Sequence, residues 1–148
     1  IVATLPQSTP FVLVAESFSG PLALKVAAEQ PEGLQGIVLC ATFIQNPVPW
    51  IPAWAAQTAH PVLFDLVPTA MMVRLLLGRD SAPTLRTQLS EIIESTPRDV
   101  LIGRARAILS VNASEELSSC RYPILYLRAT RDRVVRQHNL LKILSLKR

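Results

Sequence analysis

The sequence has 148 residues, carries a net charge of +4 and is 49% hydrophobic, with 18% charged residues. This length accommodates one domain with a buried core, and the apolar content excludes a disordered chain. One uncharged stretch, residues 42–64, contains four prolines, which excludes a membrane-spanning helix there.

The cysteines and the charges also limit the possible functions. Cys40 and Cys120 lie in or beside apolar runs, without a Cys or His at metal-ligand spacing, so we expect buried, reduced thiols and a cytoplasmic location. Residues 121–148 carry eight Arg or Lys against one acid. Because these bases lie along one predicted helix and the loop before it, we expect a solvated helix face and no nucleic-acid partner.

The first elements form a predicted β-α-β unit. Residues 11–15 are a continuous apolar run typical of a strand, and a helical pattern with Pro21 in its first turn follows. The segment Pro31-Glu32-Gly33 ends that helix, and residues 36–41 form a second apolar run. Continuous apolar runs predict parallel strands that are covered on both faces.

The middle of the chain is predicted to be helical. Residues 68–77 form one candidate helix, which Gly78 ends. The segment Thr96-Pro97-Arg98-Asp99 is close to a capping box at the start of another helix. Between these two segments runs an amphipathic stripe of apolar residues at helical spacing, namely Leu85, Leu89, Ile92 and Ile93.

A third apolar run, residues 123–127, predicts the last strand, and residues 134–146 predict a closing helix. The sequence therefore predicts an α/β fold with about three parallel strands, flanking helices, and a helical cap inserted between the second and third strands. We expect one structural domain in three parts. These are a core β-α-β unit (1–43), a helical cap or lid (44–118), and a core strand with its loop and C-terminal helix (119–148).

The corner Ala15-Glu16-Ser17-Phe18-Ser19 raises a chemical question. A sharp strand-to-helix turn exposes a serine and aims the next backbone N–H at a developing oxyanion, provided that small residues flank the serine. The strict form of this motif is Gly-x-Ser-x-Gly. Here Ala15 and Ser19 occupy the glycine positions, and Gly20 lies one position late. On the local pattern alone, a serine that caps the helix explains the corner equally well.

Asp132 lies in the loop just past the predicted strand 123–127. Ligand and catalytic groups gather at the carboxyl ends of strands in open α/β sheets, and an acid there can orient a catalytic histidine. The alternative is an ordinary acid in a surface turn, flanked by Arg131 and Arg133.

Two segments carry a family resemblance. Residues 10–43 resemble the nucleophile elbow, following helix and next strand of the α/β-hydrolase superfamily, and residues 122–135 resemble its acid-bearing strand and loop. The resemblance implies a partial α/β-hydrolase fold, with Ser17 as nucleophile, Asp132 as triad acid and the Phe18 N–H as an oxyanion donor. It implies no metal and no organic cofactor.

The triad histidine is not found where the superfamily has it, after one further strand beyond the acid. His138 comes only six residues after Asp132, and His60 has no positional match to the triad base. We therefore expect a fragment that lacks the N-terminal strands and the C-terminal histidine segment, with little or no turnover by itself.

The resemblance implies a serine hydrolase acting on a small carboxylic ester or thioester with an apolar acyl group. Candidate pocket residues lie in the expected cap, and their alternative role is packing of the cap against the core. The alternative function is a non-catalytic α/β-hydrolase-like protein that binds a ligand or a partner. The candidate pocket residues are Trp50, Trp54, Phe64 and Met71.

Overall fold

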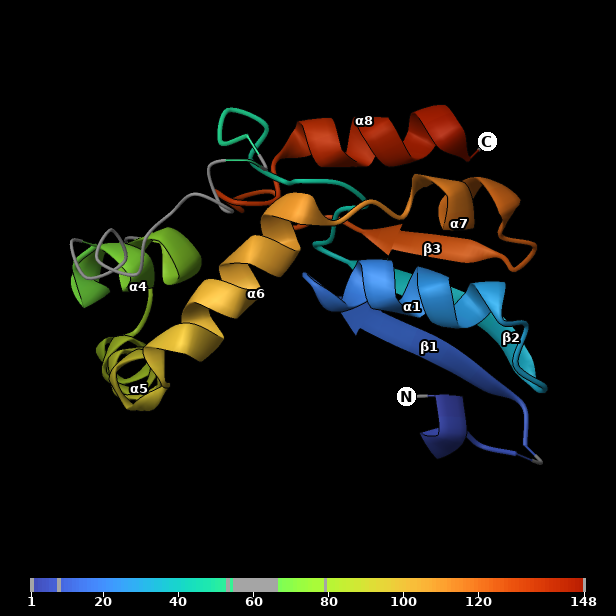
Figure 1. Cartoon of the computed structure of the whole chain (residues 1–148), viewed down its shortest axis with the longest axis horizontal. Helices are drawn as coiled ribbons and strands as arrows, with labels where there is room; N and C mark the ends of the chain where they lie inside the picture. The colour runs from blue at the N-terminus through green and yellow to red at the C-terminus, as the bar shows by residue number, and fades with distance from the viewer. Residues whose placement is uncertain (1, 8, 53, 55–66, 79, 148) are drawn as a thin grey trace.

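The computed structural model describes residues 2–7, 9–52, 54, 67–78 and 80–147. A three-stranded sheet and its helices lie together, and further helices extend away from them between the second and third strands (Figure 1). In chain order the elements are the 3-10 helix η1 (Val2–Thr4), β1 (Phe11–Glu16), α1 (Ser19–Ala28), β2 (Leu34–Cys40), α4 (Thr69–Leu77), α5 (Pro83–Ser95), α6 (Arg98–Ser110), α7 (Ser114–Ser119), β3 (Ile124–Leu127) and α8 (Gln137–Leu146).

All three strands of the sheet are parallel, with β2 between β1 and β3. In the register, Val14 pairs with Val38, and Val38 pairs with Leu125 on its other side. Each strand was recognisable because it is a short run of β-branched and aliphatic residues bounded by turn residues. The predicted α/β fold with three parallel strands is confirmed.

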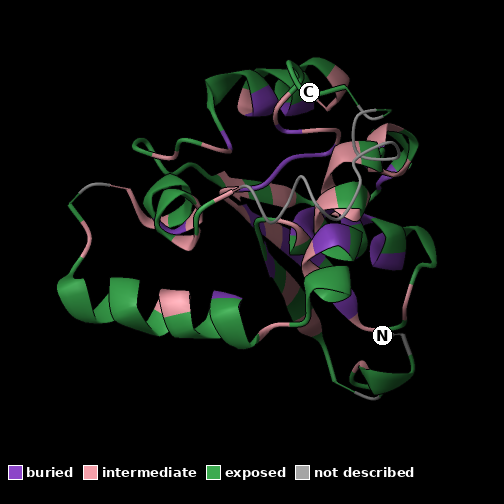
Figure 2. Ribbon diagram, turned by 60° about the vertical axis from the view of Figure 1, so that its left-hand side comes forward, coloured by how far each residue is buried: buried purple, intermediate pink, exposed green. Residues whose placement is uncertain are grey.

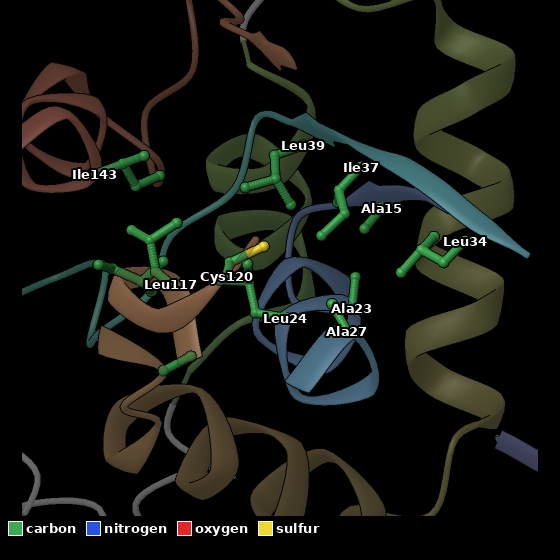
Figure 3. Close-up of a cluster of buried hydrophobic side chains, with 12 residues drawn as sticks. Ala15, Ala23, Leu24, Ala27, Leu34, Ile37, Leu39, Leu117, Cys120 and Ile143 are labelled. Atoms are coloured by element: carbon green, nitrogen blue, oxygen red, sulfur yellow. The ribbon is translucent and has the colours of Figure 1, made fainter. Parts of the chain in front are cut away.

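One face of the sheet is covered by helices and holds the core. Figure 3 shows Ala23, Leu24 and Ala27 of α1 facing the strands, beside Leu117 of α7. The small side chains of α1 let its backbone approach the sheet closely, and Ile143 of α8 completes this layer. The strands contribute buried apolar residues to the same cluster, namely Ala15, Leu34, Ile37 and Leu39.

The opposite face of the sheet is open, which corrects the expectation of strands covered on both faces. Burial alternates along β1 and β3, and Val14 and Leu125 remain 74% and 57% exposed. Val12 and Leu127 are also exposed. A continuous apolar run has the same appearance whether one or both faces are packed, because the pattern records side-chain type and not what covers it.

The helices α4, α5 and α6 form a loosely packed group, here called the outer helices. Each has one buried residue, which is Val73, Ile93 and Ile102 respectively. Their helical character was predicted correctly, but Leu85 and Ile92 of the predicted stripe are exposed. Figure 2 shows buried residues gathered where the sheet and its helices meet.

The helix α7 packs on the core although it lies inside the segment predicted as a cap. Ala113 and Leu117 are fully buried, and both belong to the core cluster around α1. The division into residues 1–43, 44–118 and 119–148 stays a prediction. The structure packs α7 with the core, although most of this helix lies within residues 44–118.

The predicted capping box at Thr96 is wrong. Thr96 ends α5 instead, and its hydroxyl donates to the Ile92 carbonyl oxygen at 2.6 Å. The N-cap of α6 is Pro97, which makes no side-chain capping bond. A threonine between two helices can serve either one, and here it bonds the preceding turn.

The basic residues near the C-terminus are solvated, as the sequence predicts. Arg128, Arg131, Arg133 and Arg136 are exposed, and so is Lys142 on α8. Within the part of the chain that the structure describes, no helix is both long and apolar enough to cross a membrane.

Candidate active site

The corner between β1 and α1 holds Ser17 in a strained backbone conformation. Its φ is 53°, in the left-handed region, which costs a non-glycine residue about 1–3 kcal/mol. The Ser17 N–H donates to the Cys40 carbonyl oxygen at 3.0 Å, and the Ser17 carbonyl oxygen accepts from the Gly20 N–H at 3.1 Å. Because β1 ends at Glu16 and α1 begins at Ser19, the predicted strand-turn-helix corner is confirmed.

The side chain of Ser17 does not cap the helix that follows it. The N-cap of α1 is Phe18, without a side-chain capping bond. The nearby hydroxyl of Ser19 donates back to the Glu16 carbonyl oxygen at 2.6 Å. Ser17 is exposed, and exposure is what nucleophilic attack requires. The helix-capping alternative therefore does not describe this corner.

Gly20 is a glycine because a neighbouring side chain occupies the space of a Cβ atom. A Cβ added there would lie 2.8 Å from both Cβ and Cγ2 of Thr42, closer than real carbon atoms approach. The glycine that appears one position late in the sequence motif is thus the one that the corner needs. It lets the first turn of α1 approach the chain that leaves β2.

Thr42 joins the corner to the end of the neighbouring strand. It is fully buried, and its hydroxyl donates to the Ser17 carbonyl oxygen. Sequence reasoning missed this residue. The sequence signal that could have indicated Thr42 is a hydroxyl residue directly after a predicted apolar strand. In the structure its neighbour Ala41 also has a positive φ of 41°.

Tyr126 of β3 extends the same chain of hydrogen bonds. Its hydroxyl donates to the Thr42 carbonyl oxygen at 2.8 Å. Burial raises the pKa of the Tyr126 phenol above its ordinary value. The negative charge of Asp132 raises that pKa further. Tyr126 therefore stays protonated and donates at neutral pH.

Asp132 is held in a fixed orientation by the backbone that follows it. Its Oδ1 accepts from the N–H groups of Val134 and Val135, both at 2.8 Å. These two bonds form a local turn, and α8 accordingly begins at Gln137 instead of Val134 as predicted. The half-buried carboxylate keeps its second oxygen outside this turn, where it can accept a bond from another group.

The sheet brings Ser17 and Asp132 to the same edge. Both follow the carboxyl ends of parallel strands, and the Ala41 N–H donates to the Leu127 carbonyl oxygen at 2.8 Å between them. No hydrogen bond joins the two side chains among the described residues. The arrangement fits a pair that acts through a third group, as serine and acid do in a Ser-His-Asp triad.

A cavity of about 220 Å³ lies beside Asp132. It is lined by the acid loop, with Arg131 and Arg133, and by the last residues of α4 from Leu75 to Gly78. A larger cavity of about 580 Å³ lies between α4 and α5 and does not reach Ser17 or Asp132. We place the candidate site at the sheet edge because the strained serine and the fixed carboxylate are there.

His138 lies in the first turn of α8, against the segment that holds Pro47. Its Nε2 is 3.1 Å from the Pro47 carbonyl oxygen and 3.2 Å from the Asn139 Nδ2. Its ring packs edge-to-face on Trp50. His60 lies outside the described residues. Within those residues no group of three or more His, Cys, Asp or Glu could hold a metal ion.

Three of the predicted pocket residues, Trp50, Trp54 and Met71, do not line the cavity beside Asp132. Trp50, Trp54 and Met71 are all exposed, and the guanidinium of Arg136 lies 5.2 Å from the centre of the Trp50 ring. Phe64 lies outside the described residues. A role of these side chains in substrate binding stays a prediction.

Comparison with known families agrees with the fold. A model of the serine aminopeptidase S33 family matches residues 1–145. The chain belongs to this family of α/β-hydrolases. A comparison of this chain with curated proteins found no significant match.

Solved structures of hydrolases share the fold of this family member. A lipase-esterase related protein from Clostridium acetobutylicum has a TM-score of 0.71 at 14% identity, over 93% of this chain and 54% of that one. A hydrolase from Oleispira antarctica has a TM-score of 0.69 at 12% identity, over 93% and 54%. An esterase from a Rhodococcus species has a TM-score of 0.62 at 19% identity, over 92% and 53%. The chain therefore spans about half the length of these hydrolases, and the likeness establishes the fold.

Proposed function

We propose that the protein is a serine hydrolase that acts on a carboxylic ester or thioester with an apolar acyl group. The observation that carries this proposal is the left-handed backbone of Ser17, with a φ of 53° at the carboxyl end of β1. A non-glycine residue retains such a conformation only where its surroundings impose it, and such strain concentrates at functional sites. This corner exposes a hydroxyl at the edge of the sheet.

In the proposed reaction, the Ser17 Oγ attacks the carbonyl carbon of the ester while the general base takes the hydroxyl proton. The C–O or C–S bond then breaks, and the alcohol or thiol leaves with that proton as the acyl-enzyme forms. Water then attacks the acyl-enzyme and releases the acid. The negative oxygen in both steps accepts a hydrogen bond from the Phe18 N–H. Among the described residues, this N–H takes no part in the turn, loop and cap hydrogen bonds, as an oxyanion donor requires.

Asp132 orients the general base in this proposal. Two backbone N–H groups hold its Oδ1, so the other oxygen can accept from the N–H of an imidazole. Among the described residues no histidine is hydrogen-bonded to Asp132, and the Nε2 of His138 lies 3.1 Å from the Pro47 carbonyl oxygen instead. Without a base, a serine hydroxyl is a weak nucleophile at neutral pH. We therefore expect slow turnover from the chain unless an imidazole is supplied.

The apolar acyl group is proposed from the side chains beside the acid. Leu75 and Leu76 are exposed, and both border the cavity that Asp132 lines. Apolar walls with a few convergent polar groups are typical of sites for small molecules. We propose that the acyl chain contacts these leucines.

The second candidate is a non-catalytic relative that binds a ligand or a partner. The open face of the sheet favours it, since Val14 and Leu125 lie exposed on that face, on either side of Val38. Large exposed apolar patches mark interaction surfaces. This candidate predicts that no chemistry depends on Ser17.

Hydrolysis of p-nitrophenyl esters with short and long acyl chains, with and without added imidazole, tests the proposal. We expect imidazole to raise a Ser17-dependent rate, which is larger for the longer acyl chain. In Ser17→Ala the rate falls to that of imidazole alone, whereas Ser19→Ala keeps most of it. Equal imidazole-supported rates in the wild type and Ser17→Ala would reject the hydrolase and favour the binding protein.

A further inference from the structure

We propose that Thr42 is a positioning residue, which aims the oxyanion donor of the Ser17 corner through its hydroxyl group. This inference rests on the proposed function and adds to it a residue that follows β2, the strand next to the one that Asp132 follows. The relevant geometry is that of one peptide unit, the one between Ser17 and Phe18.

The Ser17 carbonyl and the Phe18 N–H belong to the same planar peptide unit and point in opposite directions. The carbonyl oxygen accepts from the Thr42 hydroxyl and from the Gly20 N–H at 3.1 Å. These two bonds fix the carbonyl side of the plane. They therefore fix the direction of the Phe18 N–H on the other side, which is the donor that the oxyanion needs.

Thr42 is suited to this role because it is itself immobile. Its side chain is fully buried, and the added-Cβ clash at Gly20 shows that the first turn of α1 lies directly against it. Its carbonyl oxygen accepts from the Tyr126 hydroxyl at 2.8 Å. The only other acceptor near the Thr42 hydroxyl among the described residues is the Phe43 carbonyl oxygen, at 3.4 Å, which is the weaker contact.

Two substitutions separate the hydroxyl from the bulk of the side chain. Thr42→Val keeps the shape and removes the donor, whereas Thr42→Ser keeps the donor and removes a methyl group. A role in packing alone predicts that Ser is the more harmful change. A positioning role predicts that Val is the more harmful change and that Ser restores function.

The first readout is the rate at which a fluorophosphonate labels Ser17. In this step, run with added imidazole, the Ser17 Oγ bonds to phosphorus, the P–F bond breaks, fluoride leaves, and the hydroxyl proton passes to the imidazole. Because the phosphoryl oxygen occupies the place of the oxyanion, misdirection of the donor slows labelling, and we expect a roughly 10- to 100-fold loss in Thr42→Val. Thr42→Ser recovers most of the rate.

The matched control is Thr87→Val on α5. The Thr87 hydroxyl donates to the Pro83 carbonyl oxygen at 3.3 Å on an exposed helix, so this variant makes the same chemical change far from the corner. We expect its labelling rate to equal that of the wild type. Equal rates for Thr42→Val and Thr42→Ser, or an unchanged rate in Thr42→Val, would overturn the inference.

The second readout is amide hydrogen exchange, which does not depend on activity. In Thr42→Val the Gly20 amide, which donates to the Ser17 carbonyl oxygen, exchanges up to roughly tenfold faster. The Ile37 amide in the centre of the sheet, which donates to Pro123, is unchanged. Thr42→Ser restores the Gly20 rate.

The two readouts distinguish failure of this inference from failure of the proposed function. If the wild type is not labelled at Ser17, the proposed function fails, and exchange at Gly20 still decides whether Thr42 holds the peptide. If Thr42→Val changes the exchange of the Gly20 amide but not the labelling of Ser17, then Thr42 orders the corner without aiming the donor. That result overturns the inference. Equal loss of protection at Gly20 and Ile37 would mean general destabilisation, which overturns it as well.

Discussion

The carboxyl edge of the sheet and the outer helices differ in how firmly their side chains are held. Around Ser17 the chain is bonded to Cys40, Gly20 and Thr42, and the helix that follows has six buried residues. Each outer helix has one. Figure 1 shows the outer helices extending away from the sheet.

This difference suggests separate roles for the rigid sheet edge and the loosely packed outer helices. The strained serine and the fixed acid lie where packing and hydrogen bonds can maintain an unfavourable conformation. The leucines proposed to meet the acyl group lie on α4, which has few buried contacts and can open locally at low cost. The proposed chemistry therefore belongs to the rigid region, and the proposed selection of substrate belongs to the adaptable one.

The same substitution in the two regions provides the largest test of this comparison. Gly20→Ala forces a Cβ against Thr42 at the packed corner, and we expect a loss of about 1–3 kcal/mol in the free energy of unfolding. Gly103→Ala adds a Cβ in α6 where no atom lies within 4 Å, and we expect a gain of about 1 kcal/mol from helix propensity. Urea denaturation measures both changes in the free energy of unfolding, provided that its dependence on urea concentration has the same slope in each variant.

The opposite signs are the informative part of that experiment. If Gly20→Ala proves neutral, the corner has room to relax and the comparison between a rigid and a loose region loses its basis. A destabilising Gly103→Ala would show instead that the outer helices are packed more closely than their exposure indicates.

A smaller effect is expected from removing one hydrogen bond beneath the corner. Tyr126→Phe deletes the donor to the Thr42 carbonyl oxygen, which costs about 0.5–1.5 kcal/mol. The matched variant Thr87→Val removes an exposed hydroxyl in the outer helices, and we expect no measurable change. Denaturation midpoints at neutral pH compare the two variants, and equal losses would contradict the account.

Tyr126 also gives this effect a pH dependence. Its pKa in the folded protein is raised above the ordinary value of 10.0, so the folded state holds this proton more tightly than the unfolded chain. The stabilisation is fully present below pH 10 and is lost as the pH rises from there through the folded-state pKa. The stability difference between wild type and Tyr126→Phe should therefore shrink above pH 10. A difference that grows there would refute the assigned shift.

The sequence predicted the strands and the corner because their signals are local. The predicted runs 11–15, 36–41 and 123–127 are short apolar segments between turn residues and fall on β1, β2 and β3, and the change from strand to helix falls at Ser17. The open face of the sheet was not predictable, because exposure of Val14 depends on what packs over it and not on its own type. The start of α8 was misplaced because Asp132 bonds two N–H groups that would otherwise begin the helix.

The contacts that organise the site were beyond sequence reasoning. Thr42 meets Ser17 across 25 positions and receives a bond from Tyr126 across 84 positions. Such pairs depend on the register of three strands, which a single sequence does not reveal. Gly20 appeared misplaced in the motif until the position of Thr42 explained it.

Peptide mapping of a covalent serine adduct tests directly whether Ser17 is the nucleophile. After treatment with a fluorophosphonate in the presence of imidazole, we expect the adduct to lie on Ser17, to persist in Ser19→Ala and to be absent from Ser17→Ala. An adduct on Ser19, or one that forms undiminished in Ser17→Ala, would contradict the assignment of Ser17 as the nucleophile.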